Sequence, residues 1–190
     1  MTFSHLFFLP TETKIIHPLF LYLCDETARY KLRGIYSEDP FMTTIRITKE
    51  FRFEAAHALR GYDGPCKSIH GHSYELSVTV TGSPVAGSGS PKAGMVMDFG
   101  DLKQIIKKNI IDSVDHALIL NKDYPLEDIQ KIREVFCNVI WVDYQPTSEN
   151  MLTDFSRKIK NLLPEGVRLH SLRLRETANS FAEWVAEDNL

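Results

Sequence analysis

Residues 66–80 read CKSIHGHSYELSVTV, and the alternation of side chains in this stretch decides how the chain folds. In an extended strand, side chains two residues apart point to the same face of the sheet. His70 and His72 therefore share a face, which the following side chains continue: Tyr74, Leu76, Val78 and Val80. The pattern predicts a strand over residues 70–82 with two imidazoles at the start of its buried face.

A second alternating stretch lies upstream, at residues 44–57, and it ends with Ala55 and His57 on one face. Before His57, Lys49 is the only polar residue on this face. If the two strands pair, His57 can supply a third nitrogen to an ion held by His70 and His72. Three protein ligands with one open position are typical of catalytic zinc, whereas structural zinc usually has four. The residues favour such a zinc site, and three polar histidines at strand ends and in a loop are the alternative.

Two helices are predicted downstream. Asp98 and Asp101 are suitable N-cap residues for a helix near residues 100–112, and Thr147 or Ser148 is suitable for a second helix that stops before residues 164–166. Further strands are expected over residues 167–176 and 180–186. The order strand, strand, helix, helix, strand, strand predicts an α+β fold, with an antiparallel four-stranded sheet and two helices packed on one face.

The composition is that of an ordinary globular protein. The chain has 190 residues, 43% of them hydrophobic and 25% charged, which suits one domain with a substantial core. A net charge of −3 and the absence of a long basic run give no reason to expect a nucleic-acid partner. Three scattered cysteines favour a reducing cytoplasm, and no apolar stretch is long enough to span a membrane.

Several further motifs follow in order along the chain: FRFEAAHA (51–58), GMVMDF (94–99), VDHA (114–117), LN (120–121), PTSEN (146–150) and RET (175–177). Together with the stretch at 66–74, they resemble the 6-pyruvoyltetrahydropterin synthase family over roughly residues 43–186. The Cys-x-x-x-His-Gly-His spacing is similar to that of the 6-carboxytetrahydropterin synthases of queuosine biosynthesis. The pyruvoyl enzymes tend to place more residues between the cysteine and the first histidine.

The resemblance implies the tunnelling fold (T-fold), in which the sheets of several subunits join edge to edge into a barrel. It implies a zinc-dependent lyase, a 6-carboxy-5,6,7,8-tetrahydropterin synthase that converts 7,8-dihydroneopterin triphosphate to 6-carboxytetrahydropterin, acetaldehyde and triphosphate. Two alternatives are open. One is a 6-pyruvoyltetrahydropterin synthase, which eliminates triphosphate and keeps the carbon chain, and the other is a non-catalytic relative that binds only zinc or pterin.

The resemblance also assigns the proton-transfer residues. Cys66 would be the base or acid that moves protons on the pterin side chain, and Asp115 with His116 would be the second proton-transfer pair. In the family this pair approaches the cysteine and the metal from a neighbouring subunit. The chain is therefore expected to form a homo-oligomer with active sites at subunit interfaces.

The substrate is expected to be held by three polar residues. By resemblance, the Glu176 carboxylate accepts two hydrogen bonds from the 2-amino and N3 groups of the pterin, while Thr147 and Glu149 help to hold the ring. Helix capping explains Thr147 almost as well. The sequence contains no glycine-rich phosphate loop, and it does not show which basic side chains bind the triphosphate.

Two segments depart from the compact family pattern. Residues 1–41 show no sustained period and are interpreted as an N-terminal extension that is poorly ordered or results from a start codon assigned too early, with an arm that packs on a neighbouring subunit as the alternative. The T-fold domain is expected over residues 42–190. Within it, residues 122–145 form an insertion with a short helix and the apolar run 139–142. Cys137 in this insertion is interpreted as a small buried hydrophobe.

Because the motifs begin after Met42, we expect residues 1–41 to be dispensable. A chain that begins at Met42 should fold, assemble and turn over as the full chain does, as measured by circular dichroism, size-exclusion chromatography and steady-state kinetics. Loss of assembly in the shortened chain would instead indicate a packing role for the extension.

Overall fold

The computed structural model describes residues 43–87 and 89–190, so the extension expected at residues 1–41 lies outside the described part. The strands are β1 (Ile45–His57), β2 (His70–Gly82), β3 (Ala117–Asn121), β4 (Val139–Val142), β5 (Arg168–Thr177) and β6 (Ser180–Val185). The helices are α2 (Phe99–Ile106), α3 (Asp112–Val114), α4 (Leu126–Val135) and α5 (Ser148–Ile159). Short helical turns are η3 (Pro65–Lys67), η4 (Lys107–Ile111) and η5 (Ala186–Asn189).

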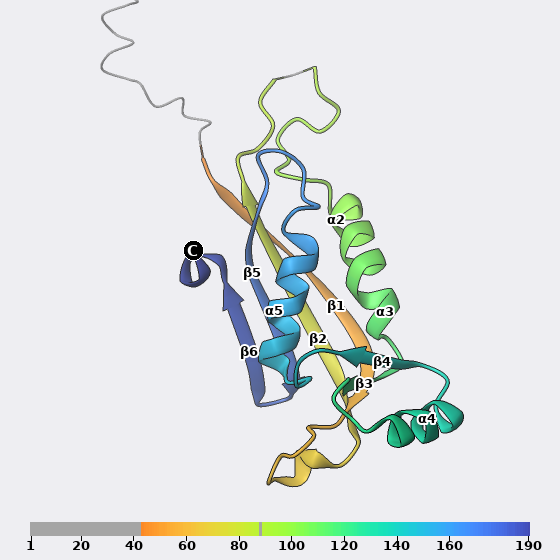
Figure 1. The fold of residues 1–190 in the computed structure, drawn as a ribbon. Helices are drawn as coiled ribbons and strands as arrows, with labels where there is room; N and C mark the ends of the chain where they lie inside the picture. Colours follow the sequence, from red (N-terminus) through yellow and green to blue (C-terminus); the bar gives the residue numbers. More distant parts are fainter. Residues whose placement is uncertain (1–42, 88) are drawn as a thin grey trace, which may run out of the picture. The chain divides into compact units, whose positions relative to one another are not determined.

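The strands form one six-stranded mixed sheet in the order β4-β3-β1-β2-β5-β6 (Figure 1). The α+β class is confirmed, and the four long strands lie within one or two residues of their expected bounds. The sheet differs from the expected one in two added strands, since β3 pairs parallel with β1 and β4 pairs parallel with β3. All five residues of β3 are buried, so its sequence lacks the alternation by which the other strands were predicted.

The antiparallel pairing of β1 and β2 builds the core. Phe53 lies opposite Tyr74 in the ladder, and their rings stack with centroids 5.0 Å apart. Along β2, every second side chain from Tyr74 to Val80 is at most 1% exposed. This alternation places one face of the sheet against the helices and leaves the other face polar.

Both long helical segments cover the buried face of the sheet (Figure 1). Helix α5 packs on β5 and β6, and α2 and α3 pack on β1. The expected caps are present, because the Asp98 side chain accepts a hydrogen bond from the Gly100 N–H and Thr147 accepts one from the Asn150 N–H. The chain is helical from residue 99 to residue 114, and η4 is a wider, π-helical turn inside this segment.

The insertion contributes the short helix α4 and the edge strand β4. Helix α4 has no buried residue, and its Leu126 is 78% exposed. Strand β4 instead closes a small second core around Ala58, Leu118 and Leu120, against which Trp141 packs. The insertion therefore covers the outer edge of β3.

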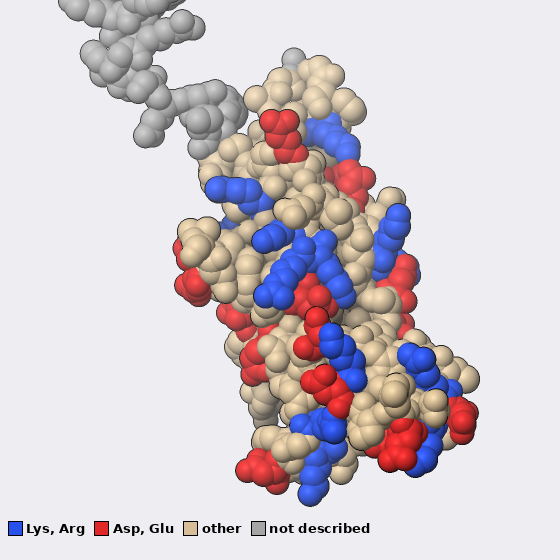
Figure 2. All heavy atoms as spheres, viewed as in Figure 1, with Lys and Arg blue, Asp and Glu red and all other residues tan. Residues whose placement is uncertain are grey.

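The outer surface over the helices carries interspersed charges of both signs (Figure 2). The last turn of α5 carries Arg157 and Lys158, and the Lys158 ammonium pairs with the Asp154 carboxylate at 2.7 Å. Within the part of the chain that the structure describes, no helix combines the length and the apolar character that crossing a membrane requires.

Candidate active site

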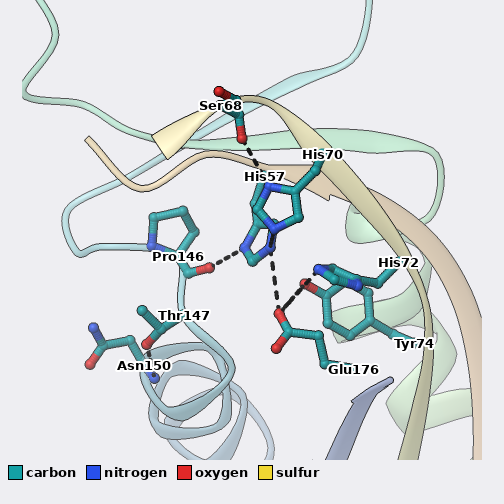
Figure 3. A network of polar contacts seen from close by, with 9 residues as sticks. All are labelled: His57, Ser68, His70, His72, Tyr74, Pro146, Thr147, Asn150 and Glu176. Atoms are coloured by element: carbon teal, nitrogen blue, oxygen red, sulfur yellow. Dashed lines mark hydrogen bonds and ion pairs between the residues drawn. The ribbon is translucent and has the colours of Figure 1, made fainter. Parts of the chain in front are cut away.

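Three histidines converge at one end of the sheet. His57 is the last residue of β1 and lies directly opposite His70, the first residue of β2, in the ladder. His72 lies two residues further along β2 and points to the same face (Figure 3). One ring nitrogen from each of the three lies within 4.8 Å of the others, so the strand pairing brings together the residues that the sequence indicated as metal ligands.

Backbone carbonyls fix the orientation of two of these rings. His57 Nδ1 lies 2.6 Å from the Pro146 carbonyl oxygen, and His70 Nδ1 lies 2.8 Å from that of Ser68. A carbonyl oxygen only accepts hydrogen bonds, so each Nδ1 carries the proton and donates it. The Nε2 atoms of both rings then present lone pairs, which is the arrangement found in metal-binding histidines.

The donor set fits a metal ion. The Nε2 atoms of His57 and His70 lie 3.1 Å apart, and two lone pairs at this distance repel each other unless a cation lies between them. His72 Nε2 is buried, and no residue that the structure describes forms a hydrogen bond with it. Burial lowers the pKa of both His57 and His72, which keeps these imidazoles neutral and able to bind a cation. Three neutral imidazoles are ligands that zinc accepts.

Glu176 faces the same cluster from the end of β5. Its Oε1 atom lies 3.4 Å from the Nε2 atoms of both His57 and His72, and it accepts a hydrogen bond from the Tyr74 hydroxyl at 3.3 Å (Figure 3). Burial, followed by the nearby Glu176 carboxylate, raises the pKa of Tyr74, so this phenol remains a donor. One carboxylate oxygen is thus directed toward the histidines.

A cavity of about 350 Å³ opens beside the cluster. It is lined by the expected residues His57, Cys66, Thr147, Glu149 and Glu176. Cys66 is a free, partly buried thiol in the turn η3. The main-chain fold of this loop is held by a hydrogen bond from the Leu59 N–H to the Cys66 carbonyl at 2.9 Å. One metal candidate, His57, therefore shares a cavity with the thiol and the pterin-binding candidates.

Two polar groups of this site were not identified from the sequence. The Ser148 hydroxyl is buried, has no hydrogen-bond partner within residues 43–87 and 89–190, and belongs to a residue that lines the cavity. The Tyr74 hydroxyl donates a hydrogen bond to Glu176. Tyr74 shares the parity of His70 and His72, which is a signal that the pattern already contained. Ser148 lies inside the motif at 146–150, and the sequence identified it only as an N-cap candidate for the helix that begins there. A second role, in the cavity, was therefore not predicted.

Asp115 and His116 lie away from this cavity. His116 lines a second hollow, of about 610 Å³, together with Glu54, Phe136 and Cys137. His116 Nδ1 lies 3.0 Å from Asp115 Oδ1, and the His116 side chain is 77% exposed. The Glu54 N–H and the imidazole together hold the pKa of Asp115 below its usual range. A single chain thus forms the pair but does not bring it to Cys66.

The interpretation of Cys137 as a buried hydrophobe is wrong. Its side chain is exposed and lines the hollow of the Asp115–His116 pair. The physical reason is that α4 lies on the surface and buries no side chain, so the residues that follow it remain accessible.

Comparison with known proteins agrees with this geometry. A family model described as 6-pyruvoyl tetrahydropterin synthase matches residues 46–187. The 6-carboxy-5,6,7,8-tetrahydropterin synthase of Haemophilus influenzae is 38% identical over 145 residues, which cover 74% of this chain and 98% of that protein. A protein of the same name from Aquifex aeolicus is 30% identical over 164 residues, covering 74% and 98%.

Solved structures with the same fold include an uncharacterized protein of Wolinella succinogenes, with a TM-score of 0.62, 23% identity, and coverage of 75% of this chain and 98% of that one. The 6-pyruvoyl tetrahydropterin synthase of Caenorhabditis elegans has a TM-score of 0.55 and 24% identity, with coverage of 76% and 96%. These likenesses confirm the T-fold. The chain belongs to the 6-pyruvoyl tetrahydropterin synthase family.

The buried histidines predict how the metal-free protein responds to acid. The pKa of His57 is lowered from 6.5 in the folded state, so the unfolded chain binds more protons once the pH falls below that value. We expect the free energy of unfolding to decrease as the pH falls from about 7 toward 5, and to decrease less in His57→Gln. Urea unfolding in the presence of a chelator measures both slopes, and equal slopes would contradict the buried, neutral state of His57.

Proposed function

We propose that this protein is a zinc-dependent 6-carboxy-5,6,7,8-tetrahydropterin synthase of queuosine biosynthesis. With water, it would convert 7,8-dihydroneopterin triphosphate to 6-carboxytetrahydropterin, acetaldehyde and triphosphate. The observation that carries the proposal is the cluster of three histidines, one of which, His57, lines a cavity together with a free thiol and a carboxylate. The Cys-x-x-x-His-Gly-His spacing and the name shared by the curated relatives support this choice of reaction.

The zinc ligands are His57, His70 and His72. Zinc, when bound, supplies a Lewis acid that polarises oxygens of the substrate side chain. The carbonyls of Pro146 and Ser68 orient two of the ligand rings. Such outer hydrogen bonds contribute to metal affinity in comparable sites.

The pterin ring is held by the Glu176 carboxylate. A carboxylate can accept two parallel hydrogen bonds from the 2-amino and N3 groups of the ring, and both bonds are strengthened by its charge. The Tyr74 hydroxyl restrains Glu176 on the side of the histidines. Thr147 and Glu149 line the same cavity at the start of α5 and would contact the ring from there.

Proton transfer is assigned to Cys66 and to the Asp115–His116 pair. Cys66 lines the cavity of its own chain, whereas His116, with the Asp115 carboxylate beside it, lines the second hollow. We therefore propose that the pair serves the cavity of a neighbouring subunit. Within the described residues, the sheet has open edges that a neighbour could cover, because β3 covers β1 only at residues 55–57 and β6 ends the sheet on the other side.

The direct test is to incubate the zinc-loaded protein with 7,8-dihydroneopterin triphosphate and to identify the products by mass. We expect 6-carboxytetrahydropterin and an equivalent of acetaldehyde. A product that retains all three side-chain carbons would identify a pyruvoyl synthase instead. Tight binding without turnover would identify a non-catalytic relative.

Cys66→Ala should separate catalysis from binding. The three histidines and Glu176 are untouched by this change, so zinc content and pterin affinity should remain those of the wild type. Turnover should fall by roughly 10²–10⁴-fold, the scale for losing a positioned proton-transfer group. Cys24→Ala, in the extension that is expected to be dispensable, is the matched control, and wild-type turnover in Cys66→Ala would exclude the proposed role of the thiol.

Glu176→Gln should have the opposite profile. The amide is nearly isosteric with the carboxylate but loses the charge that strengthens both hydrogen bonds to the ring. We expect the pterin dissociation constant to rise by roughly tenfold or more, while zinc content stays at one ion per chain. Fluorescence titration and metal analysis measure the two quantities, and loss of zinc would show that Glu176 is a metal ligand.

Mixed oligomers should test whether two subunits form one site. Cys66→Ala and His116→Ala chains carrying different tags are produced together and purified through both tags. If the pair serves a neighbouring cavity, half of the chains retain Cys66 and half of their neighbours retain His116, so about a quarter of the wild-type activity should return. Cys66→Ala with His57→Ala should recover none, because both residues line one cavity and every cavity then lacks either the thiol or a zinc ligand. Absence of recovery in the first mixture would contradict the shared site.

A further inference from the structure

The backbone of His116 has an unusual conformation. Its φ angle is +58°, and among residues 43–87 and 89–190 it is the only non-glycine residue with a positive φ. A side chain in this region of the φ/ψ map costs free energy, and it persists where surrounding contacts determine it. The contacts around His116 should therefore reveal what holds the proton-transfer pair in place.

Strand β1 holds the pair on one side through Glu54. The His116 N–H donates to the Glu54 carbonyl at 2.6 Å, and the Glu54 N–H donates to Asp115 Oδ1 at 3.0 Å. The first bond continues the β1–β3 ladder by one residue beyond the Ala55–Ala117 pair, and the second ties the Asp115 side chain to β1. They fix the backbone N–H of His116 but do not involve its backbone carbonyl.

The insertion holds the other side through Asn138. The Asn138 side-chain amide donates to the His116 carbonyl at 3.2 Å and approaches the Asp115 carbonyl at 3.5 Å. The Asn138 main chain is fixed as well, because its carbonyl accepts a hydrogen bond from the Leu118 N–H at 2.9 Å, immediately before β4 begins. One residue thus joins the edge of β3 to both carbonyls of the pair.

We propose that Asn138 is a positioning residue for the Asp115–His116 pair, and that the insertion at 122–145 contributes to catalysis through it. This inference rests on the proposed function of the pair in proton transfer. The start of β4 fixes the main chain of Asn138. The Asn138 amide then stabilises the left-handed conformation of His116, so that the imidazole is directed out of its own subunit. Without this contact, His116 can relax toward ordinary φ values and its ring moves away from the substrate of the neighbouring subunit.

The chemistry of the contact requires an amide. Both partners are carbonyl oxygens, so the residue at position 138 must donate protons. Asn138→Asp keeps the shape of the side chain but faces two carbonyl oxygens with a group that only accepts. Asn138→Ala removes the contact, and Asn138→Gln keeps the donors on a longer stem.

In the zinc-loaded enzyme, Asn138→Asp and Asn138→Ala should lower kcat by roughly tenfold, the effect of a misplaced catalytic group, with KM changed by less than about twofold. Asn138→Gln should retain more activity than either. Zinc content should be unchanged in all three. Asn109→Ala is the matched control, because Asn109 also donates from its amide to a backbone carbonyl, that of Ile105 at 2.8 Å, but has no contact with the pair.

A double-mutant cycle identifies the route of the effect. In a His116→Ala background, Asn138→Asp should cause no further loss of kcat, because Asn138 acts only through His116. An equal additional loss in both backgrounds would overturn the proposal in favour of a general structural role. Wild-type kcat in Asn138→Asp and Asn138→Ala would also overturn it.

Failure of the proposed function gives a different pattern, namely unchanged turnover in His116→Ala. The position of the ring can then be followed without turnover, by the imidazole NMR signals of His116, assigned by their loss in His116→Ala. These signals should shift in Asn138→Asp and remain unchanged in Asn109→Ala. Unshifted signals in Asn138→Asp would overturn the positioning role by itself.

Discussion

The antiparallel register between β1 and β2 is the constraint on which the rest of the structure depends. It places His57 opposite His70 and Phe53 opposite Tyr74, so the metal candidates and the core share one continuous face. A slip of one residue would turn every side chain of the moving strand to the other face. The buried aromatic stack of Phe53 and Tyr74 opposes such a slip, and the hydrophobic core thereby sets the geometry of the polar cluster next to it.

Each buried polar group of the cluster depends on a hydrogen bond or ion pair with another group of the same cluster. Tyr74 is 1% exposed and needs the Glu176 oxygen, Glu176 lies against two imidazoles, and His57 needs the Pro146 carbonyl. Burying such groups without hydrogen-bond partners costs free energy. One nitrogen, His72 Nε2, has no hydrogen-bond partner among the described residues. A cation bound to the three nitrogens would remove the remaining unfavourable contacts, so metal binding and the stability of this end of the sheet are coupled.

Much of the fold could be predicted from alternation and caps, because β1, β2, α5 and β5 each have a buried face and a polar face, and β6 packs its partly buried Ala182 and Trp184 on the core. The short strands could not. The five residues of β3 are buried on both faces, and β4 takes its place only by pairing with β3, which is a nonlocal contact. Strand parity predicted that the three histidines would share one face, and they lie together at one end of the sheet, where Cys66 and Glu176 line a cavity beside His57. The roles of these residues stay predictions.

The position of the Asp115–His116 pair was less accessible. Adjacent residues in a sequence motif carry no information about which hollow they line, and the left-handed turn at His116 depends on contacts with Glu54 and Asn138, which are distant in the chain. The exposure of Cys137 was missed for a similar reason, because whether a helix such as α4 docks on the core is decided by tertiary packing. The spacing of apolar residues such as Leu126 and Ile132 predicted a helix, but it did not show whether this helix is buried or lies on the surface.

The wide turn η4 has a consequence for the phase of the helix that leads to this pair. Leu102, Ile106, Ile110 and Val114 follow one another at a strict four-residue interval, and each is at most 4% exposed. In a helix of uniform 3.6-residue pitch, each such step rotates the side chain by about 40°, so the last would point about 120° away from the first. The π-helical turn at Lys107–Ile111 absorbs this rotation and keeps all four side chains on the sheet. The four-residue spacing that begins at Leu102 therefore sets the direction in which the chain leaves the helix at Asp115.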